Sequence, residues 1–205
     1  VGGRLVLRMA DADVLPFQFG VFADTVSRYA KDVTALADAE RDETAETNRR
    51  LAERSLQNAA DPRETYVPPA PKDPVPYLNL SPLQNALTRL RERAAACDQA
   101  LQTAAAAEGG VPAALQQPLD VLLFQSERAL LIDKGLPRRP WFKHGIYAPG
   151  LYTGYGVKTL PGVREAIEQR EWTDAEQQAV AIADGLDRLA TQLQRATDLL
   201  KNGGR

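Results

Sequence analysis

The sequence predicts an all-α protein: a four-helix bundle with a proline-rich crossover and a long loop, rich in aromatic residues and glycine, before the last helix. Apolar residues recur at steps of three and four along several segments, and no segment alternates apolar and polar residues as a strand would. None of the 14 glycines lies between Val21 and Glu108, whereas six fall from Gly135 to Gly162. Long helices are therefore expected in the first span and loops in the second.

The first helix is predicted from a stripe of apolar residues near the N-terminus. Its members follow one another at alternating steps of four and three: Phe22, Val26, Tyr29, Val33 and Leu36. The residues beyond Leu36 are mostly charged or small, and no glycine or proline interrupts them, so the helix is expected to continue to about Asn58. Its second half would then project into solvent or meet another chain.

A proline-rich crossover is predicted next, because residues 61–82 hold seven of the 14 prolines of the chain. Such a composition is typical of an extended, polyproline-like connector. The apolar side chains of Tyr77, Leu78 and Leu80 would pin it to the bundle. The alternative is a mobile ligand for a partner protein, formed by residues 67–76, and the sequence leaves both interpretations open.

The second helix has signals at both ends. Ser81 stands where an N-cap serine is expected, and Pro82 stands at the first helical position. Gly109-Gly110 ends the helix. The apolar stripe between these ends consists of Leu83, Leu87, Leu90, Ala94, Cys97 and Leu101.

Prolines, cap residues and glycines also delimit the third and fourth helices. The third is expected to begin near Pro112 or Pro118 and to continue to Gly135. The fourth starts at the cap signal of residues 173–176 and closes at Gly203-Gly204. Their apolar residues are Leu119, Leu122, Leu123, Leu130 and Leu131 in the third helix, and Val180, Ala183, Leu186, Leu189, Leu193, Ala196 and Leu200 in the fourth.

Charge and composition exclude several classes of function. Lysine and arginine number 25 against 27 acidic residues, so the net charge of −2 provides no basic field, and nucleic acid is not an expected partner. No apolar stretch approaches the roughly 20 residues of a membrane span. The single cysteine, Cys97, cannot form an internal disulfide, and with a single histidine, His144, no metal site is expected within this chain.

No catalytic residue is assigned in this chain. His144 has no serine in a G-x-S-x-G context to activate, and its basic and aromatic neighbours favour a structural hydrogen bond. Cys97 lies on the apolar stripe of the second helix, where a thiol is usually part of the core and unreactive. The carboxylates of Glu168 and Glu171 are indistinguishable from ordinary surface charge.

The loop between the third and fourth helices is the candidate functional segment. It spans about 40 residues, a length that usually indicates a function inside a compact domain. Five of the 13 aromatic residues lie from Trp141 to Tyr155. Flanking glycines and the phenols of Tyr152 and Tyr155 suit the lining of a ligand pocket or of a contact with another domain. The alternative, that the aromatic residues only staple the loop to the bundle, stays open.

A series of motifs along the chain resembles a known family. Along the chain they are Ala12-Asp13-Val14-Leu15-Pro16-Phe17, Tyr29-Ala30, Glu127-Arg128-Ala129, Gly135-Leu136-Pro137, Arg139-Pro140, His144, Ile146-Tyr147-Ala148-Pro149, Tyr155, Pro161-Gly162 and Ala166. These motifs closely resemble the C-terminal helical domain of glutamate carboxypeptidase II. That domain is the transferrin-receptor-like dimerisation domain of a group of zinc peptidases also called N-acetylated alpha-linked acidic dipeptidases. The resemblance spans nearly the whole chain.

The resemblance implies that residues 1–205 form one helical domain, a fragment of a longer peptidase. In that family the helical domain forms much of the homodimer contact and lends a loop to the substrate pocket. The zinc ligands and the general-base glutamate lie in a preceding peptidase domain, so zinc belongs to the parent protein and this chain alone has no catalysis. The implied partners are a second copy, the upstream peptidase domain and a peptide substrate. The implied location is extracytoplasmic or secreted.

Three residues of the loop are assigned to the substrate pocket. By the resemblance, Tyr155 matches the tyrosine that contacts the carboxylate of the C-terminal glutamate of the substrate. Gly154 stands where the mammalian carboxypeptidase has a lysine. A cation next to that anionic group is thus missing, and the resemblance leaves the preference for a C-terminal glutamate open. Tyr152 on the same loop, which also differs from the mammalian residue, is the third.

Two other functions remain open at this point. The receptor-like branch of the same superfamily uses the fold to bind proteins without catalysis, and the sequence upstream of this chain would separate the two branches. A free-standing helical adaptor that uses residues 67–76 as a ligand would be a monomer with a protease-sensitive proline segment.

Overall fold

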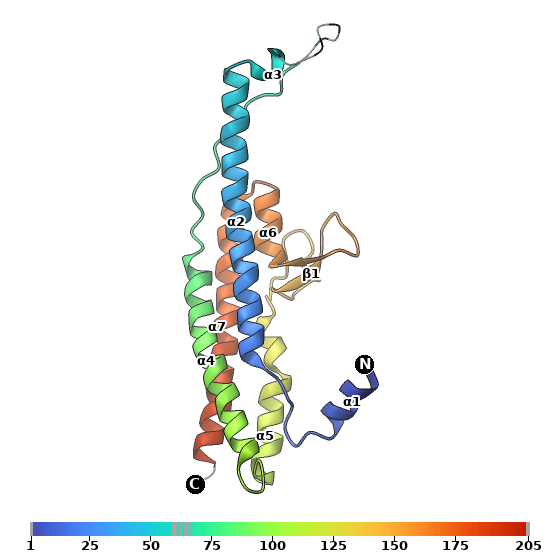
Figure 1. Cartoon of the computed structure of the whole chain (residues 1–205), viewed down its shortest axis with the longest axis vertical. Helices are drawn as coiled ribbons and strands as arrows, with labels where there is room; N and C mark the ends of the chain where they lie inside the picture. Colours follow the sequence, from blue (N-terminus) through green and yellow to red (C-terminus); the bar gives the residue numbers. More distant parts are fainter. Residues whose placement is uncertain (1, 59–60, 62, 64, 66, 204–205) are drawn as a thin grey trace.

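Four long helices dominate the computed structural model, which describes residues 2–58, 61, 63, 65 and 67–203. They are α2 (Phe19–Ala52), α4 (Ser81–Ala106), α5 (Ala113–Phe124) and α7 (Trp172–Asn202), so the predicted all-α bundle is confirmed (Figure 1). The shorter elements are α1 (Gly2–Ala10), α3 (Ser55–Asn58), the 3-10 helix η1 (Ser126–Leu130), strands β1 (Tyr147–Pro149) and β2 (Val157–Thr159), and α6 (Pro161–Glu168).

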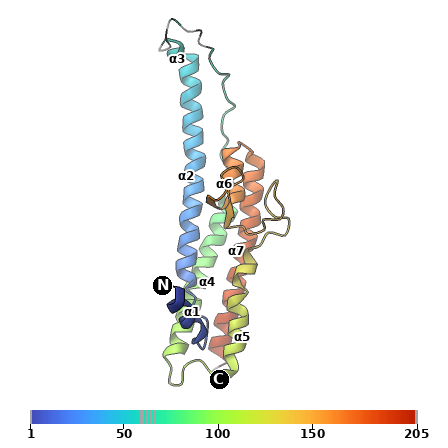
Figure 2. The same cartoon turned by 90° about the vertical axis from the view of Figure 1, so that its right-hand side faces the viewer.

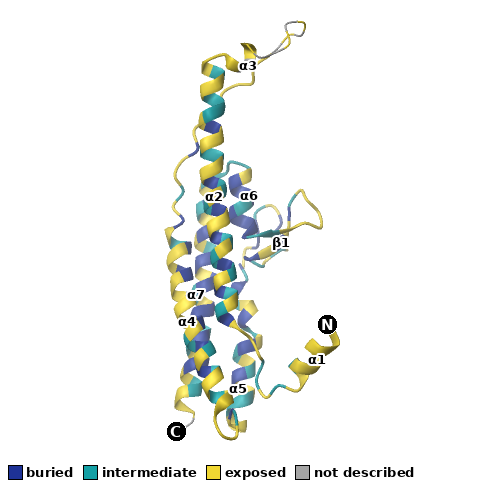
Figure 3. Cartoon of the chain, in the orientation of Figure 1, coloured by how far each residue is buried: buried dark blue, intermediate teal, exposed yellow. Residues whose placement is uncertain are grey.

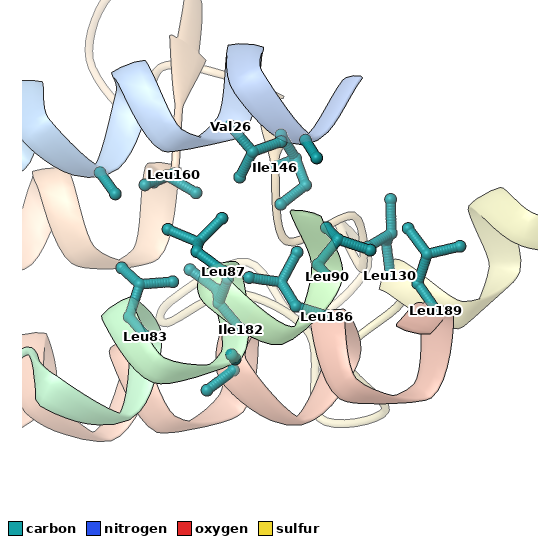
Figure 4. Close-up of a cluster of buried hydrophobic side chains, with 14 of the residues drawn as sticks. Val26, Leu83, Leu87, Leu90, Leu130, Ile146, Leu160, Ile182, Leu186 and Leu189 are labelled. Atoms are coloured by element: carbon teal, nitrogen blue, oxygen red, sulfur yellow. The ribbon is translucent and has the colours of Figure 1, made fainter. Parts of the chain in front are cut away.

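The core lies where the apolar stripes of α2, α4 and α7 meet (Figure 4). Val26, Leu90 and Leu186, one from each helix, are 0% exposed. These members of the predicted stripes are therefore confirmed as core. Val180 is an exception at 45% exposed, because Ala179, one residue earlier and about 100° around the helix, takes the buried position.

α2 extends beyond the bundle, and its far end is half-buried or exposed (Figure 3). Its last buried residue is Thr44, whose hydroxyl accepts a hydrogen bond from Arg170 at 3.0 Å. The helix ends at Ala52 rather than at Asn58. Arg54 takes a left-handed conformation with a φ of 56°, which breaks the right-handed helix before α3 begins.

The proline-rich connector runs back beside α2 in an extended conformation (Figure 2). Asn48 on α2 exchanges two hydrogen bonds with the backbone of Lys72, at 2.8 and 3.0 Å. The guanidinium of Arg41 lies 4.1 Å from the centre of the Tyr77 ring, which otherwise stays exposed. Leu80 is buried in the core. These contacts favour a packed crossover over a mobile ligand.

The third helix is shorter than predicted. α5 begins after Pro112, continues through Pro118 and ends at Phe124, not at Gly135. After η1, the backbone turns extended at Leu131, which pairs with His144 in an isolated antiparallel bridge. The prediction was wrong here because this pairing is a tertiary contact, and local periodicity does not report it.

Several boundaries and short elements also differ from the predictions. α4 begins at Ser81 itself, with Leu80 in the cap position, and α7 begins at Trp172, one residue before the predicted cap signal. Gly204 lies outside the described residues. α1, α6 and the two strands were not predicted, because three-residue strands are too short to show alternation and α6 falls within the expected loop.

We expect Leu186→Ala to lower the free energy of unfolding by about 2–5 kcal/mol, because it leaves a cavity where α4 and α7 meet. Val180→Ala on the same helix is the control and should change it by less than about 0.5 kcal/mol, because that side chain is exposed. Urea unfolding followed by circular dichroism measures both. Equal losses would contradict the assignment of the core.

Candidate functional site

The segment between η1 and the hairpin folds back on itself beside the bundle. The Leu136 N–H donates to the carbonyl of Phe142 at 2.8 Å. Gly135 has a φ of 68°, and a Cβ there would collide with the carbonyl of Pro140, so the turn requires glycine. Ile132 and Leu136 bury their side chains in the core. The first part of the segment expected to be a loop, residues 131–146, is therefore ordered, and we call it the platform.

The hairpin stands on this platform. β1 and β2 pair antiparallel, with Ala148 opposite Lys158. Just past β2, the N–H of the fully buried Leu160 donates to the carbonyl of Ile146 at 2.9 Å. The base of the hairpin is thus fixed to the core, while its tip, residues 150–156, projects from the side of the bundle (Figure 1).

The tip carries all three residues assigned to a substrate pocket. Tyr152 is 81% exposed, and Tyr155 is fully exposed. Gly154 has a φ of 59°, a left-handed conformation that favours glycine, and the space beyond its Cα is open. The structure therefore brings the three residues onto one solvent-facing turn. Their role in binding a substrate stays a prediction.

A buried ion pair supports the base of the tip. Arg139 and Glu165 are 3% and 5% exposed, and Nη2 of Arg139 lies 2.6 Å from Oε2 of Glu165. The other carboxylate oxygen, Oε1, accepts a hydrogen bond from the N–H of Leu151 at 2.8 Å. Nη1 of Arg139 donates to the carbonyl of Pro149. One ion pair therefore holds the chain on both sides of Gly150.

Neither member of this ion pair is predicted as a site residue from the sequence. Arg139 occurs there only within a family motif, and Glu165 is not singled out. A signal does exist, because Glu165 interrupts a run of buried apolar residues in α6, and a carboxylate at such a position needs a cationic partner. The identity of that partner depends on the tertiary fold.

His144 makes the predicted structural hydrogen bond. Its Nδ1 accepts from the N–H groups of Ile146 and Tyr147 at 3.3 and 3.2 Å, and its ring stacks on that of Tyr147. Burial lowers the pKa of His144, and the carboxylate of Glu127, 3.5 Å from Nε2, opposes this shift. The neutral imidazole is thus the form that the fold favours.

The other candidate catalytic groups are paired or buried. Glu168 pairs with Lys158, and Glu171 pairs with Arg138 at 2.7 Å. Cys97 is 0% exposed, and burial raises its pKa to about 11, as expected for a core thiol.

Across the part of the chain that the structure describes, no three His, Cys, Asp or Glu side chains gather to hold a metal ion. No described helix is long and apolar enough to cross a membrane.

An apolar groove of about 320 Å³ opens between the start of α2 and the end of α5. We call it the Phe17–Phe124 groove, and its apolar lining consists of Phe17, Phe19, Phe22, Leu123, Phe124, Leu130, Tyr147 and Leu189. Phe17 is 38% exposed and Phe124 is 49% exposed. Val121, one turn before Phe124, is 41% exposed. Among the residues that the structure describes, this apolar face is only partly covered.

α1 is a second apolar feature that the bundle does not cover. It lies apart from the other helices, and none of its residues is buried (Figures 1 and 2). Leu5, Val6 and Leu7 are 61%, 66% and 63% exposed. Arg4 and Arg8 give the helix an amphipathic character. An apolar face of this kind is suited to packing on another protein surface.

Comparisons with known proteins concentrate on one family. A family model described as the transferrin receptor-like dimerisation domain matches residues 78–194. A probable glutamate carboxypeptidase of Arabidopsis thaliana is 35% identical over 79 residues, which cover 38% of this chain and 12% of the relative. One of Arthroderma benhamiae is 38% identical over 61 residues, covering 30% and 8%, and one of Zea mays is 30% identical over 79 residues, covering 38% and 11%. The matched segments are thus about a tenth of the relatives' length.

We expect the stability of the domain to fall as the pH drops through 6.5, the ordinary pKa of histidine. Because the pKa of His144 is lower in the folded state, the unfolded chain binds the proton more readily, and the stabilisation present above this pH is lost below it. His144→Asn keeps an acceptor near the two N–H groups but does not titrate. Thermal melts between about pH 8 and 5 should show a flatter profile for this variant. Identical profiles would contradict the assignment.

Proposed function

The chain belongs to the transferrin receptor-like dimerisation domain family, and we propose that it pairs two copies of a glutamate carboxypeptidase-like zinc peptidase. The observation that carries this proposal is the family match over residues 78–194, which include α4, α5, the hairpin and α6. The family resemblance stated from the sequence is confirmed over residues 78–194, and its extension to the rest of the chain stays a prediction. Because the relatives are far longer than the matched segments, zinc and catalysis are proposed for the rest of the parent protein, not for this chain.

The Phe17–Phe124 groove is the proposed contact between two copies. A two-fold contact must be self-complementary, because the same patch faces itself. On this face the apolar groove is lined in part by Phe124, an aromatic side chain that is 49% exposed. Each copy can therefore insert Phe124 toward the groove of the other. Covering these exposed side chains stabilises a dimer by about 25 cal/mol per Å² of apolar surface.

The hairpin tip is the proposed contribution of this chain to the substrate pocket of the parent. Support comes from the placement of Tyr152, Gly154 and Tyr155 on one projecting turn that the bundle leaves uncovered. The resemblance implies that the hydroxyl of Tyr155 donates to the C-terminal carboxylate of a peptide. At the terminal carboxylate of the substrate, this hydrogen bond would hold the substrate rather than take part in the cleavage step.

The apolar side of α1 is the proposed contact with the upstream peptidase domain. Support comes from the exposure of Leu5, Val6 and Leu7, which the described residues of this chain do not cover.

An extracytoplasmic or secreted location of the parent is proposed on the resemblance alone. A receptor-like parent that binds proteins without catalysis is the alternative function.

We expect the purified chain to form dimers at high micromolar concentration, as measured by sedimentation equilibrium. Phe124→Ser should weaken the dimer at least about tenfold, because the Phe124 ring becomes buried between the two copies and anchors the contact. Val180→Ser is the matched control, since Val180 is 45% exposed and does not line the groove. A strict monomer, or equal weakening by both substitutions, would contradict the proposed contact.

In the parent peptidase, we expect Tyr155→Phe to raise KM about tenfold to hundredfold and to leave kcat nearly unchanged. A hydrogen bond to a charged group contributes about 1.5–3 kcal/mol, and here it is present equally in the ground and transition states. Tyr77→Phe, an exposed tyrosine on the connector, should change neither constant. Steady-state kinetics on a set of dipeptides checks this. If Tyr155→Phe leaves KM unchanged for every dipeptide, the assignment of Tyr155 to the substrate pocket is wrong. If the parent protein has no peptidase activity, the receptor-like alternative is favoured.

A further inference from the structure

We propose that Arg139 and Glu165 are positioning residues that fix the conformation of the hairpin tip, residues 150–156. Through the tip they set where the hydroxyl of Tyr155 lies, and this consequence for substrate binding rests on the proposed function. Neither side chain reaches the surface, so neither touches a substrate itself. Their effect on binding passes through the backbone of the tip.

The contacts of the tip show why it needs such support. Residues 152–157 are all exposed, so no apolar packing holds them. Within the turn, the Gly156 N–H donates to the carbonyl of Thr153 at 3.3 Å, and the Gly150 N–H donates to that of Gly156 at 2.9 Å. At its base, Pro149 and Leu151 bond to the ion pair, next to the antiparallel pairing of β1 with β2. The ion pair thus links the turn to the bundle.

The chemistry of the two side chains suits this task. Arginine is planar and forked, so Arg139 donates in two directions at once, to the carbonyl of Pro149 and to the carboxylate of Glu165. Glu165 likewise divides its two oxygens between Arg139 and the N–H of Leu151. Both residues are buried, so water and salt compete little for these charge-assisted bonds. Glu165 lies on α6, which packs against α7. Its bond to Leu151 therefore fixes the position of the tip relative to the core.

A neighbouring ion pair provides a matched comparison within the same chain. Arg138 and Glu171 lie 2.7 Å apart and also join the platform to the region of α6 and α7. Their side chains are 40% and 38% exposed, and the bond that Arg138 makes is to Glu171 rather than to the tip. Substitutions at the two pairs therefore differ in burial and in contact with the tip, and little else.

Amide hydrogen exchange of this chain tests the positioning role directly. Glu165→Gln and Arg139→Lys should each speed exchange at Gly150 and Leu151 by at least about tenfold, with the amides of α4 and α7 unchanged. The controls Glu171→Gln and Arg138→Lys should leave the tip amides as they are. Unchanged exchange at the tip in both test variants would overturn the proposal. Joint loss of protection in the tip and the bundle would also overturn it, because the ion pair would then serve the whole fold.

Kinetics of the parent peptidase tests the consequence for binding. Glu165→Gln should raise KM about tenfold with kcat nearly unchanged, and in that background Tyr155→Phe should have a smaller effect than in the wild type. Additive effects of the two substitutions would overturn the link between the ion pair and Tyr155. If exchange at the tip rises while neither Glu165→Gln nor Tyr155→Phe changes KM, the positioning role stands and the proposed pocket function fails.

Discussion

The apolar stripe of α7 is the surface on which the rest of the structure is assembled. α4, α5, η1 and α6 all pack against it, and Leu186, Leu189 and Leu193 are fully or almost fully buried there. α2 joins from the other side through α4 and α6. Because η1 and α6 are both fixed to α7, the two ends of the segment between them are fixed as well. This constraint lets a long non-helical segment adopt one conformation.

Two surfaces follow from this arrangement, and they differ in chemistry. The Phe17–Phe124 groove has a largely apolar lining that comes in part from the helices of the bundle. Such a lining favours the proposed contact with a second copy. The hairpin tip projects away from the bundle, is mostly exposed and is held by the buried pair of Arg139 and Glu165. No residue of the tip lines the groove, so the two proposed contacts use different residues. The same domain can therefore serve both proposed functions.

The sequence predicts those parts of the fold in which burial follows a local repeat. Leu90 on α4 and Leu186 on α7 each belong to a set of buried apolar residues spaced three or four apart, as in a helix. The principal helices could therefore be predicted from this spacing. The end of α5 could not, because the pairing of Leu131 with His144 decides it. The ion pair beneath the tip joins residues 26 apart along the chain, and no periodicity reports such a contact. The tip residues themselves were predicted from the glycine-flanked tyrosines and from the family resemblance.

We propose that two copies meet at the groove and leave the tip uncovered. The most direct measurement is isotope-filtered nuclear Overhauser spectroscopy on a mixed dimer in which only one copy carries ¹³C. We expect contacts between copies from Val121 and Phe124 and none from Tyr152 or Tyr155. Contacts between copies from the tip tyrosines, with none from the groove, would contradict it.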